Sequence, residues 1–576
     1  MASFDLSAKR LLRELRIATR FLAFRYRRFR VVWVDSAGAE RSRSSDQRKM
    51  RYASRHFRSP RPRKHRTRSQ PKMVTDDYLQ RIEDASVYEV ATETPLEFAQ
   101  TLSRRLKNRV LLKREDLQSV FSFKLRGAYN KLSKLPRDVL DRGVICSSAG
   151  NHAQGVALAA LRLGVRAVIV MPVTTPSIKV NAVRAQGGDV VLQGDTYDDA
   201  QQHARELCEE QGLTFIHPFD DPDVIAGQGT IGREIVKQSE RRIDAVFVPV
   251  GGGGLISGIA AYIKETNPDI KIIGVEPDDS AGMQKSLAAG HPVTLEHVGI
   301  FADGVAVRRV GDETFRLCRK YVDEIITVDT DQACAAIRDI FEETRSIAEP
   351  AGALALAGIK KYIARERSRD ATFVAVIGGA NVNFDRLRHI AERAAVGEQR
   401  EMLLAVEIPE QPGSFRRFCE AIGRRSVTEF NYRYSDDTKA HIFVGVELRH
   451  GPAERARLIA KLGALGYPVQ DLSDNELAKL HIRHMVGGGR MPENEKLFRF
   501  EFPERPGALL DFLNAIGSNW NISLFHYRNH GSDYGRILAG IQVPPGEDQE
   551  LEAHLAELGY AHWDESGNPA YTTFLA

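Results

Sequence analysis

The sequence predicts an α/β protein in which a largely parallel, doubly wound sheet precedes two small α+β units. Three observations predict this fold class. Short apolar stretches alternate with helical ones from Ser86 onward, glycine-rich turns follow two of these stretches, and a motif repeats after Glu398. With 576 residues, the chain is long enough for three or four domains.

The apolar stretches of the first part are typical of buried strands, because each is short and lies next to a helical pattern. Strands joined by helices form parallel sheets, and ligands of such sheets bind at the carboxyl ends of the strands. We expect strands at residues 109–112, 144–146, 167–171, 245–250, 271–275 and 372–377.

The segment Phe121–Ala128 contains Lys124, our candidate for the reacting residue. It follows a turn-forming stretch, and we expect the hydroxyl of Ser122 to cap the helix that begins there. The N-terminus of a helix disfavours a cation, so the pKa of a lysine in the first turn should be lowered. A readily neutral lysine can form an imine with an aldehyde cofactor. Taken alone, the segment is weak evidence, because most lysines near helix starts are solvated surface residues.

Two turns made of small residues each join an apolar stretch to a helix. In the first, Ser147–Gly155, backbone N–H groups can converge at the helix start and bind a carboxylate. In the second, four glycines at 251–254 precede Leu255, the arrangement that a phosphate needs. A flexible loop is the alternative reading of the glycines.

In order and spacing, Lys124, the stretch Ser148–Gly155 and the loop Gly251–Leu255 resemble the pyridoxal-phosphate enzymes of fold type II. The resemblance is greatest to the biosynthetic threonine dehydratases and covers about Tyr88 to Ala576. It implies a catalytic region of two doubly wound subdomains with pyridoxal 5'-phosphate as cofactor. It also implies the conversion of L-threonine to 2-oxobutanoate and ammonia, the first step of isoleucine biosynthesis, with L-serine as a secondary substrate.

The resemblance assigns roles to individual residues of this chain. Lys124 would hold the cofactor as an imine and remove the Cα proton, and Asn151 would hydrogen-bond the cofactor's ring oxygen. The cofactor phosphate would be bound by backbone N–H groups of Gly251, Gly252, Gly253, Gly254 and Leu255. The substrate carboxylate would be bound by Ser148, Ala149, Gly150 and His152.

At two positions, this chain differs from other enzymes of the fold that it resembles. Racemases of this fold have a serine where this chain has Ala149, and alanine cannot transfer a proton, which favours elimination. The family usually has serine at the position of Gly378, where the hydroxyl meets the cofactor's pyridine nitrogen. With glycine there, a water or another side chain could replace the missing hydroxyl at the pyridine nitrogen, or the activity could be weakened.

Glu276 and Glu349 also resemble family positions near the site. Glu276 could help to hold a cation, but the acidic residue that follows it in metal-binding relatives is missing here, so we predict no metal. Two other functions remain open: a β-replacement reaction on the same fold, which needs a second nucleophilic substrate, and a catalytically impaired amino-acid sensor.

The repeat after Glu398 predicts a regulatory region. Residues Glu407–Gly413 recur as Glu501–Gly507, 94 positions further on, and each unit is expected to fold as βαββαβ. The units resemble ACT-like (ferredoxin-like) domains, which implies isoleucine as inhibitor and valine as a possible activator. We interpret His481 and His484 as surface residues, since no acidic or cysteine residues accompany them. The expected divisions are 1–72, a catalytic region at 73–398, ACT-like domains at 399–480 and 496–576, and a linker at 481–495.

The composition limits the location and the partners of the protein. Residues 1–72 contain 22 Lys and Arg but 5 Asp and Glu, so the rest of the chain has a net charge of −12. For the basic segment we favour disorder or a misassigned start codon over a nucleic-acid arm, a membrane anchor or an organelle transit peptide. Five dispersed cysteines fit a reducing compartment. We therefore expect a cytoplasmic protein that binds neither nucleic acid nor membrane, with import into an organelle as the alternative. The resemblance implies a homo-oligomer, expected to be a homotetramer.

Overall fold

The computed structural model describes residues 77–409, 414–423, 425, 427–434, 439–484, 494–503, 520–528 and 534–574. The predictions for residues 1–72 lie outside these ranges, as does most of the linker expected at 481–495. In the described ranges, no helix is both long enough and apolar enough to cross a membrane.

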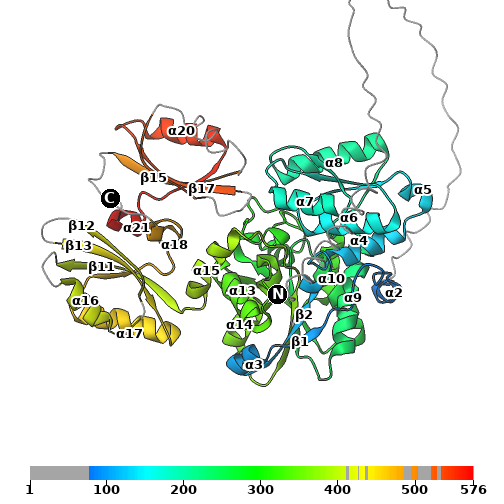
Figure 1. Cartoon of the computed structure of the whole chain (residues 1–576), viewed down its shortest axis with the longest axis horizontal. Helices are drawn as coiled ribbons and strands as arrows, with labels where there is room; N and C mark the ends of the chain where they lie inside the picture. Colours follow the sequence, from blue (N-terminus) through cyan, green and yellow to red (C-terminus); the bar gives the residue numbers. More distant parts are fainter. Residues whose placement is uncertain are drawn as a thin grey trace, which may run out of the picture. The chain divides into compact units, whose positions relative to one another are not determined.

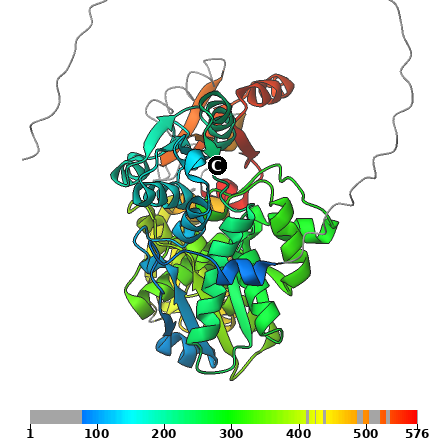
Figure 2. The ribbon, with the colours of Figure 1, turned by 90° about the vertical axis from the view of Figure 1, so that its right-hand side faces the viewer.

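The first part of the chain contains two sheets, whose segments run from blue to green in Figures 1 and 2. The smaller sheet has four parallel strands in the order β5-β4-β3-β6. Its strands are β3 (Val144–Ser147), β4 (Ala167–Met171), β5 (Asp189–Leu192) and β6 (Thr214–Phe215). Its helices are α4 (Lys124–Ser133), α5 (Arg137–Leu140), α6 (Asn151–Leu163), α7 (Ser177–Ala185) and α8 (Tyr197–Gln211).

The larger sheet has six strands in the order β1-β2-β10-β7-β8-β9, and only the β1–β2 pair is antiparallel. Its strands are β1 (Leu96–Phe98), β2 (Arg109–Arg114), β7 (Ala245–Pro249), β8 (Lys271–Pro277), β9 (Glu324–Val328) and β10 (Thr372–Ile377). Its helices are α2 (Tyr78–Glu83), α3 (Gln100–Leu106), α9 (Pro222–Gln238), α10 (Gly254–Thr266), α11 (Gly282–Ala289), α12 (Asp312–Tyr321), α13 (Thr330–Thr344), α14 (Pro350–Glu366) and α15 (Arg386–Gly397). Short 3-10 turns lie at η1 (Glu115–Leu117), η2 (Asp278–Ser280) and η3 (Asp303–Val305). The predicted doubly wound α/β fold is confirmed.

Strand β7 shows why the larger sheet is covered on both faces. Its side chains alternate in direction, as in any strand. Ala245 and Phe247 are buried in a core that includes α13 and α14, whereas Val246 and Val248 are buried in a second core with α9 and α10. A strand that is buried on both faces must be apolar throughout, which is the pattern that the sequence displays.

The C-terminal part contains two four-stranded antiparallel sheets, ordered β12-β13-β11-β14 and β16-β17-β15-β18. The first unit comprises β11 (Glu401–Pro409), α16 (Ser414–Ile422), β12 (Val427–Tyr434), β13 (Lys439–Glu447), α17 (Gly451–Ala464) and β14 (Val469–Asp471). The second comprises β15 (Glu495–Pro503), β16 (Asn521–Arg528), β17 (Tyr534–Gln542), α20 (Asp548–Leu558) and β18 (Ala561–Asp564). Between and after them lie α18 (Glu476–Leu480), η4 (Ile482–His484) and α21 (Pro569–Phe574).

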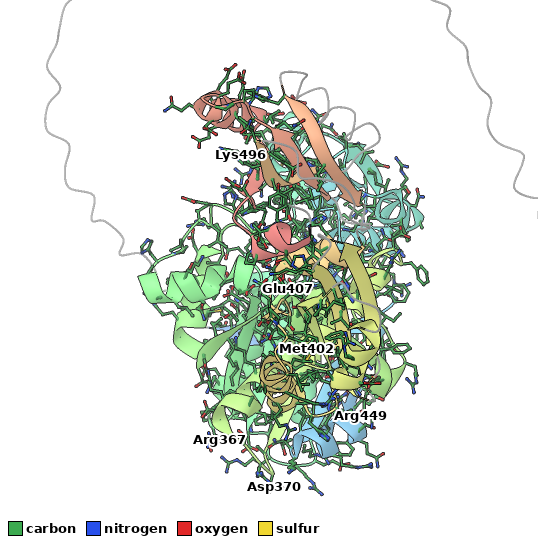
Figure 3. The ribbon with its side chains drawn as sticks, turned by 90° about the vertical axis from the view of Figure 1, so that its left-hand side faces the viewer. Arg367, Asp370, Met402, Glu407, Arg449 and Lys496 are labelled. Carbon is green, nitrogen blue, oxygen red and sulfur yellow. The ribbon has the colours of Figure 1, made fainter. Side chains whose placement is uncertain are left out.

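The repeat predicted from the sequence is visible in these strands. Strands β11 and β15 occupy equivalent positions at the centre of their sheets; Figure 3 labels Met402 and Glu407 on the first and Lys496 on the second. The first unit has the expected βαββαβ order.

His481 corrects one expectation. It was expected at the surface, but its side chain is completely buried at the C-terminal end of α18. Its neighbours Leu477 and Ile482 belong to a core that also contains Leu403 of β11 and Leu497 of β15. The stretch from α18 to η4 therefore packs between the sheets of the two units, which explains why a histidine there is not solvated.

Charged side chains connect the catalytic region to α18. Arg393 of α15 donates to Glu476 at 2.7 Å and to Asp331 of α13 at 2.5 Å. Lys479 of α18 donates to Asp331 at 2.6 Å and to Glu476 at 2.9 Å. Because Arg393 and Lys479 are both buried, these bonds lie in a less polar environment than surface ion pairs do.

Candidate active site

Lys124 is the first residue of α4, and its side chain is partly buried. Its Nζ donates a hydrogen bond to the carbonyl oxygen of Pro218 at 2.9 Å. Burial lowers the pKa of Lys124 to about 8, and the nearby charge of Glu349 opposes this shift. The predicted lowering of the pKa is confirmed in direction, but its main cause is burial rather than the helix end.

The expected cap by Ser122 is wrong. The hydroxyl of Ser122 is buried and makes no hydrogen bond to any described residue, and the N-cap position belongs to Phe123. Ser122 instead pairs in a β-bridge with Gly379, and the N–H of Phe123 donates to the carbonyl of Gly378. The chain thus enters α4 from an extended segment fixed to the end of β10, which leaves the hydroxyl turned away from the helix start.

Helix α4 is held in place by glycines where it crosses its neighbours. A Cβ on Gly155 of α6 would lie 3.0 Å from the backbone carbon of Lys124. A Cβ on Gly227 of α9 would lie 2.7 Å from the carbonyl oxygen of Arg126. Since both distances are shorter than normal contacts, only glycine at these positions permits α6 and α9 to approach α4 so closely. The backbone of Lys124 is therefore fixed from two sides.

A buried ion network anchors α4 further. Arg126, whose side chain is inaccessible, forms two-pronged hydrogen bonds with Glu115 and with Glu234 at 2.6–3.0 Å. Lys113 donates to the same Glu234 at 2.6 Å. The two carboxylates raise the pKa of Arg126 against the effect of burial, so its guanidinium stays charged. This network holds the helix that carries Lys124.

The start of α6 lies at the end of β3, as predicted. Gly150 is its N-cap residue, and the N–H of Gly150 donates to the hydroxyl of Ser148 at 3.3 Å. The imidazole of His152 is buried and its Nε2 hydrogen-bonds the carbonyl of Ile216 at 2.9 Å. Burial, together with the charge of Lys124, lowers the pKa of His152 to about 3, so the ring is neutral. Nε2 of the imidazole is thus engaged with the main chain.

The four glycines form a rigid turn at the end of β7. A Cβ on Gly252 would lie 2.3 Å from the ring of Phe219, and one on Gly251 would lie 2.9 Å from the backbone of Val305. Gly253 has a φ of 96°, and α10 begins at the next residue. Side chains are therefore excluded by sterics on both sides, and the first turn of α10 presents backbone N–H groups. The glycine turn is thus closely packed against Phe219 and Val305.

Asn151, Glu349 and Asn381 form a hydrogen-bond chain beside Lys124. Nδ2 of Asn151 donates to Oε1 of Glu349 at 2.7 Å, and Nδ2 of Asn381 donates to Oδ1 of Asn151 at 2.7 Å. The backbone N–H of Asn381 donates to Oε2 of Glu349 at 3.1 Å. Burial raises the pKa of Glu349 to about 7, and the charge of Asp303 adds to the rise.

Gly378 immediately follows β10 and has room for a side chain. A Cβ there would lie 3.5 Å from the ring of Phe123 and 3.6 Å from Cγ of Pro249, which are ordinary contacts. Packing therefore does not require a glycine at this position.

Glu276 has a local partner that the sequence did not indicate. Its two carboxylate oxygens accept the backbone N–H groups of Met283 and Gln284 at 2.8 and 2.9 Å, at the start of α11. Burial raises the pKa of Glu276 to about 7. The carboxylate thus binds the positive end of a helix. In the described part of the chain, no three His, Cys, Asp or Glu side chains are grouped so as to hold a metal ion.

Sequence reasoning found the loops but missed several of the contacts between them. The carbonyl of Pro218 and the ring of Phe219 gave no signal, because ordinary loop residues acquire these roles only through tertiary contacts. Asn381 did carry a signal: it ends the Gly378–Asn381 stretch that follows the last strand of the sheet.

Comparisons with known proteins agree with this geometry. Residues 87–379 match the family described as pyridoxal-phosphate dependent enzyme. Residues 392–482 and 486–575 match the C-terminal regulatory domain of threonine dehydratase. Two similar proteins are the L-threonine dehydratase biosynthetic IlvA of Burkholderia multivorans and that of Escherichia coli. The first is 58% identical over 88% of this chain and 100% of its own length, the second 56% over 87% and 97%.

Solved structures resemble the catalytic part. The processed form of threonine deaminase isoform 2 from Solanum lycopersicum has a TM-score of 0.55 and 54% identity, over 55% of this chain and 92% of its own. Maize serine racemase has a TM-score of 0.51 and 32% identity, over 54% of this chain and 95% of its own.

Proposed function

The chain belongs to the pyridoxal-phosphate-dependent enzymes and, within them, to the biosynthetic threonine dehydratases, and on that premise we propose that Lys124 holds the cofactor. The protein is a lyase that converts L-threonine to 2-oxobutanoate and ammonia. Its two C-terminal units fit feedback inhibition by isoleucine. The lowered pKa of the buried Lys124 amine is the observation that carries the assignment, and the close-packed glycine turn, which we propose as the phosphate site, supports it.

The residues present fit pyridoxal phosphate. The phosphate would be held by the N–H groups of Gly251 to Leu255, where the side-chain-free turn and the start of α10 favour a dianion. The ring oxygen would accept a hydrogen bond from Asn151. When bound, the cofactor supplies an electron sink that stabilises negative charge at the substrate Cα.

Lys124 has the properties of a general base. An amine with a pKa of about 8 is partly neutral near pH 7, whereas an ordinary lysine is almost fully charged. Its Nζ would take the proton from the substrate Cα. The carbonyl of Pro218 and the fixed start of α4 restrict where that nitrogen lies.

The start of α6 is suited to the substrate carboxylate. Ser148, Ala149, Gly150 and the backbone of His152 surround unpaired N–H groups of the first helical turn. The helix end supplies positive potential, so no lysine or arginine is needed. The methyl group of Ala149 cannot donate or accept a proton, so the site offers no second base there and favours elimination over racemisation.

Replacement of Lys124 by alanine tests the assignment. The change removes both the cofactor anchor and the base, so kcat with threonine should fall by several orders of magnitude. The visible absorbance of the attached cofactor should disappear with it. Lys134→Ala, at the C-cap of the same helix, is the control and should leave both readouts close to wild type. Near-native turnover by Lys124→Ala would refute the assignment.

Neither alternative function is favoured. A β-replacement enzyme would require a second, nucleophilic substrate, and the relatives are named as dehydratases. Gly378 was the reason to consider a non-catalytic sensor, but the relatives are named as dehydratases, and the lowered pKa of Lys124 supports a reacting lysine. Release of oxoacid and ammonia without any added thiol distinguishes the dehydratase from both.

Further partners and the location belong to the proposal. L-serine, one methyl group smaller than threonine, would be a secondary substrate, and valine, one methylene smaller than isoleucine, an activator at the regulatory units. We propose a homo-oligomer, and specifically a tetramer, whose contacts would cover exposed apolar side chains such as Phe384, which is 78% exposed, and Phe121, which is 57% exposed. Free Cys146, Cys208 and Cys318 support a reducing compartment, and we propose the cytoplasm.

A further inference from the structure

Glu349 is the one carboxylate in the described part of the chain that hydrogen-bonds the proposed cofactor ligand Asn151. It is the N-cap residue of α14 and is 5% exposed. Its oxygens accept one N–H from the Asn151 side chain and one from the Asn381 backbone. A Cβ on Gly379 would lie 2.7 Å from Oε1, so the carboxylate lies close against the turn after β10.

The direction of the Asn151 amide follows from its neighbours. The carbonyl of Val120 can only accept, so the group of Asn381 that faces it at 2.8 Å is the nitrogen. The same nitrogen donates to Oδ1 of Asn151, which places Nδ2 of Asn151 opposite Glu349. A reversed Asn151 amide would direct its oxygen at the carboxylate and its nitrogen at another N–H donor. The carbonyl of Val120 therefore fixes the orientation of the Asn381 and Asn151 side-chain amides, and Glu349 accepts the last hydrogen bond of the series.

In this orientation, one N–H of the Asn151 side chain remains available to a ligand. Nδ2 carries two hydrogens, one of which goes to Glu349; the other makes no hydrogen bond to the described residues. The ring oxygen of the cofactor is an acceptor, and it needs an N–H rather than a carbonyl from this side chain.

We propose that Glu349 is a positioning residue for the cofactor, which it serves by holding the Asn151 amide with an N–H toward the cofactor's ring oxygen. The inference rests on the proposed role of Asn151. Glu349 itself touches Asn151 and Asn381, and it acts through them.

A double-mutant cycle of the holoenzyme tests the inference. Wild type, Glu349→Gln, Asn151→Ala and the double variant are compared by the dissociation constant and the visible absorbance band of the bound cofactor. Glutamine has one oxygen acceptor in place of two and cannot serve both N–H groups. We expect Glu349→Gln to weaken cofactor binding by about tenfold or more, as for a lost hydrogen bond to a charged group, and to shift the band. In the Asn151→Ala background, Glu349→Gln should weaken cofactor binding by less than about twofold.

Glu276→Gln is the matched control. Glu276 is a buried carboxylate with two backbone N–H partners and a similarly raised pKa, but it binds α11 rather than Asn151. Cofactor affinity should stay within about twofold of wild type. An equal loss in Glu276→Gln would show a general effect of removing buried charge and would overturn the inference.

The remaining outcomes are also decisive. Wild-type affinity in Glu349→Gln, or losses that multiply in the double variant, would overturn the positioning role. Wild-type affinity in Asn151→Ala would refute the role of Asn151, and the inference with it, while Lys124→Ala still tests the cofactor anchor separately. If Glu349→Gln does not fold, Asn381→Ala removes the other partner of the Asn151 amide and should show the same coupled loss.

Discussion

At the scale of single residues, the main question is how the site works with glycine at position 378. A neutral hydrogen bond to the pyridine nitrogen contributes about 0.5–1.5 kcal/mol. Its absence corresponds to roughly a two- to tenfold change in rate, which is too little to abolish catalysis. Elimination also expels a leaving group that takes up electrons, so it depends less on a protonated ring than racemisation does.

We therefore expect Gly378→Ser to change threonine turnover by no more than about tenfold. The new Cβ meets only ordinary contacts with Phe123 and Pro249, so the variant should fold normally. The measurement is kcat and cofactor affinity of both forms. Gly252→Ser is the contrasting variant: its Cβ would collide with Phe219 at 2.3 Å and should strongly weaken cofactor binding. An inert wild type beside a fully active serine variant would contradict the argument.

The buried carboxyl of Glu276 makes stability depend on pH. Its pKa is raised from the ordinary 4.5 to about 7 by burial, so the folded protein binds more protons than the unfolded chain between these values. The contribution of this carboxyl to the free energy of unfolding is fully present below about pH 4.5 and is lost as the pH rises through about 7. The loss is on the order of 3 kcal/mol. Glu276→Gln should therefore show a smaller fall in Tm between pH 5 and pH 8 than wild type. Equal falls would show that Glu276 does not titrate in this range.

Single residues also show where sequence reasoning reached its limit. Lys124, the small-residue turn after β3 and the four glycines were all found, because each sits in a local strand–turn–helix pattern. The bond between Asn151 and Glu349 joins positions 198 residues apart, and no local pattern encodes it. The Ser122 cap failed for the same reason: a distant partner, Gly379, determines the conformation of its segment.

At the scale of elements, the position of α4 depends on the buried pairs of Arg126. Removing one partner of such a network leaves an uncompensated buried charge, which typically costs about 3–5 kcal/mol. In Arg126→Ala, Glu115 would lose its guanidinium partner, and Glu234 would keep Lys113 and the hydroxyl of Tyr88.

We expect Arg126→Ala to lower the free energy of unfolding by about that amount and to reduce kcat, since Lys124 is two residues away on the same helix. Urea unfolding followed by circular dichroism measures the first effect, and the threonine assay the second. Arg137→Ala is the control, because its pair with Asp141 is mostly exposed and should contribute little. A stable, fully active Arg126→Ala protein would show that helix packing alone holds α4.

Prediction at the element scale succeeded for the strands and was weaker for the C-terminal units. The six expected strands are present because buried parallel strands are recognisable from continuous apolar runs. The burial of His481 was missed, since it arises where α18 packs between two units, and a sequence repeat reveals the units but not how they pack.

At the scale of the whole molecule, the described site residues all precede the repeat. They lie between Phe121 and Asn381, whereas α18 contacts the catalytic region through Arg393 and Asp331. Catalysis and regulation are therefore separable along the chain, and Arg393 keeps Asp331 as a partner when the regulatory units are removed.

A chain that ends after Glu398 should keep threonine turnover and lose inhibition by isoleucine. The measurement is an isoleucine titration of both chains at the same threonine concentration, with Tm recorded to verify that the shorter chain is folded. The full-length protein provides the reference curve. Undiminished inhibition in the shorter chain would place the effector site within the catalytic region.

The position of β10 has a consequence for synthesis on the ribosome. This strand is the last of its sheet in sequence, yet it lies between β2 and β7, where no earlier strand can take its place. At about 5–20 residues per second, roughly 13–50 s pass between translation of Lys124 and of Asn381. Until β10 is translated, β2 has no partner on that edge, and neither does β7 once it has been made. Unpaired strand edges promote aggregation, so we expect chaperones to bind the nascent chain during this interval.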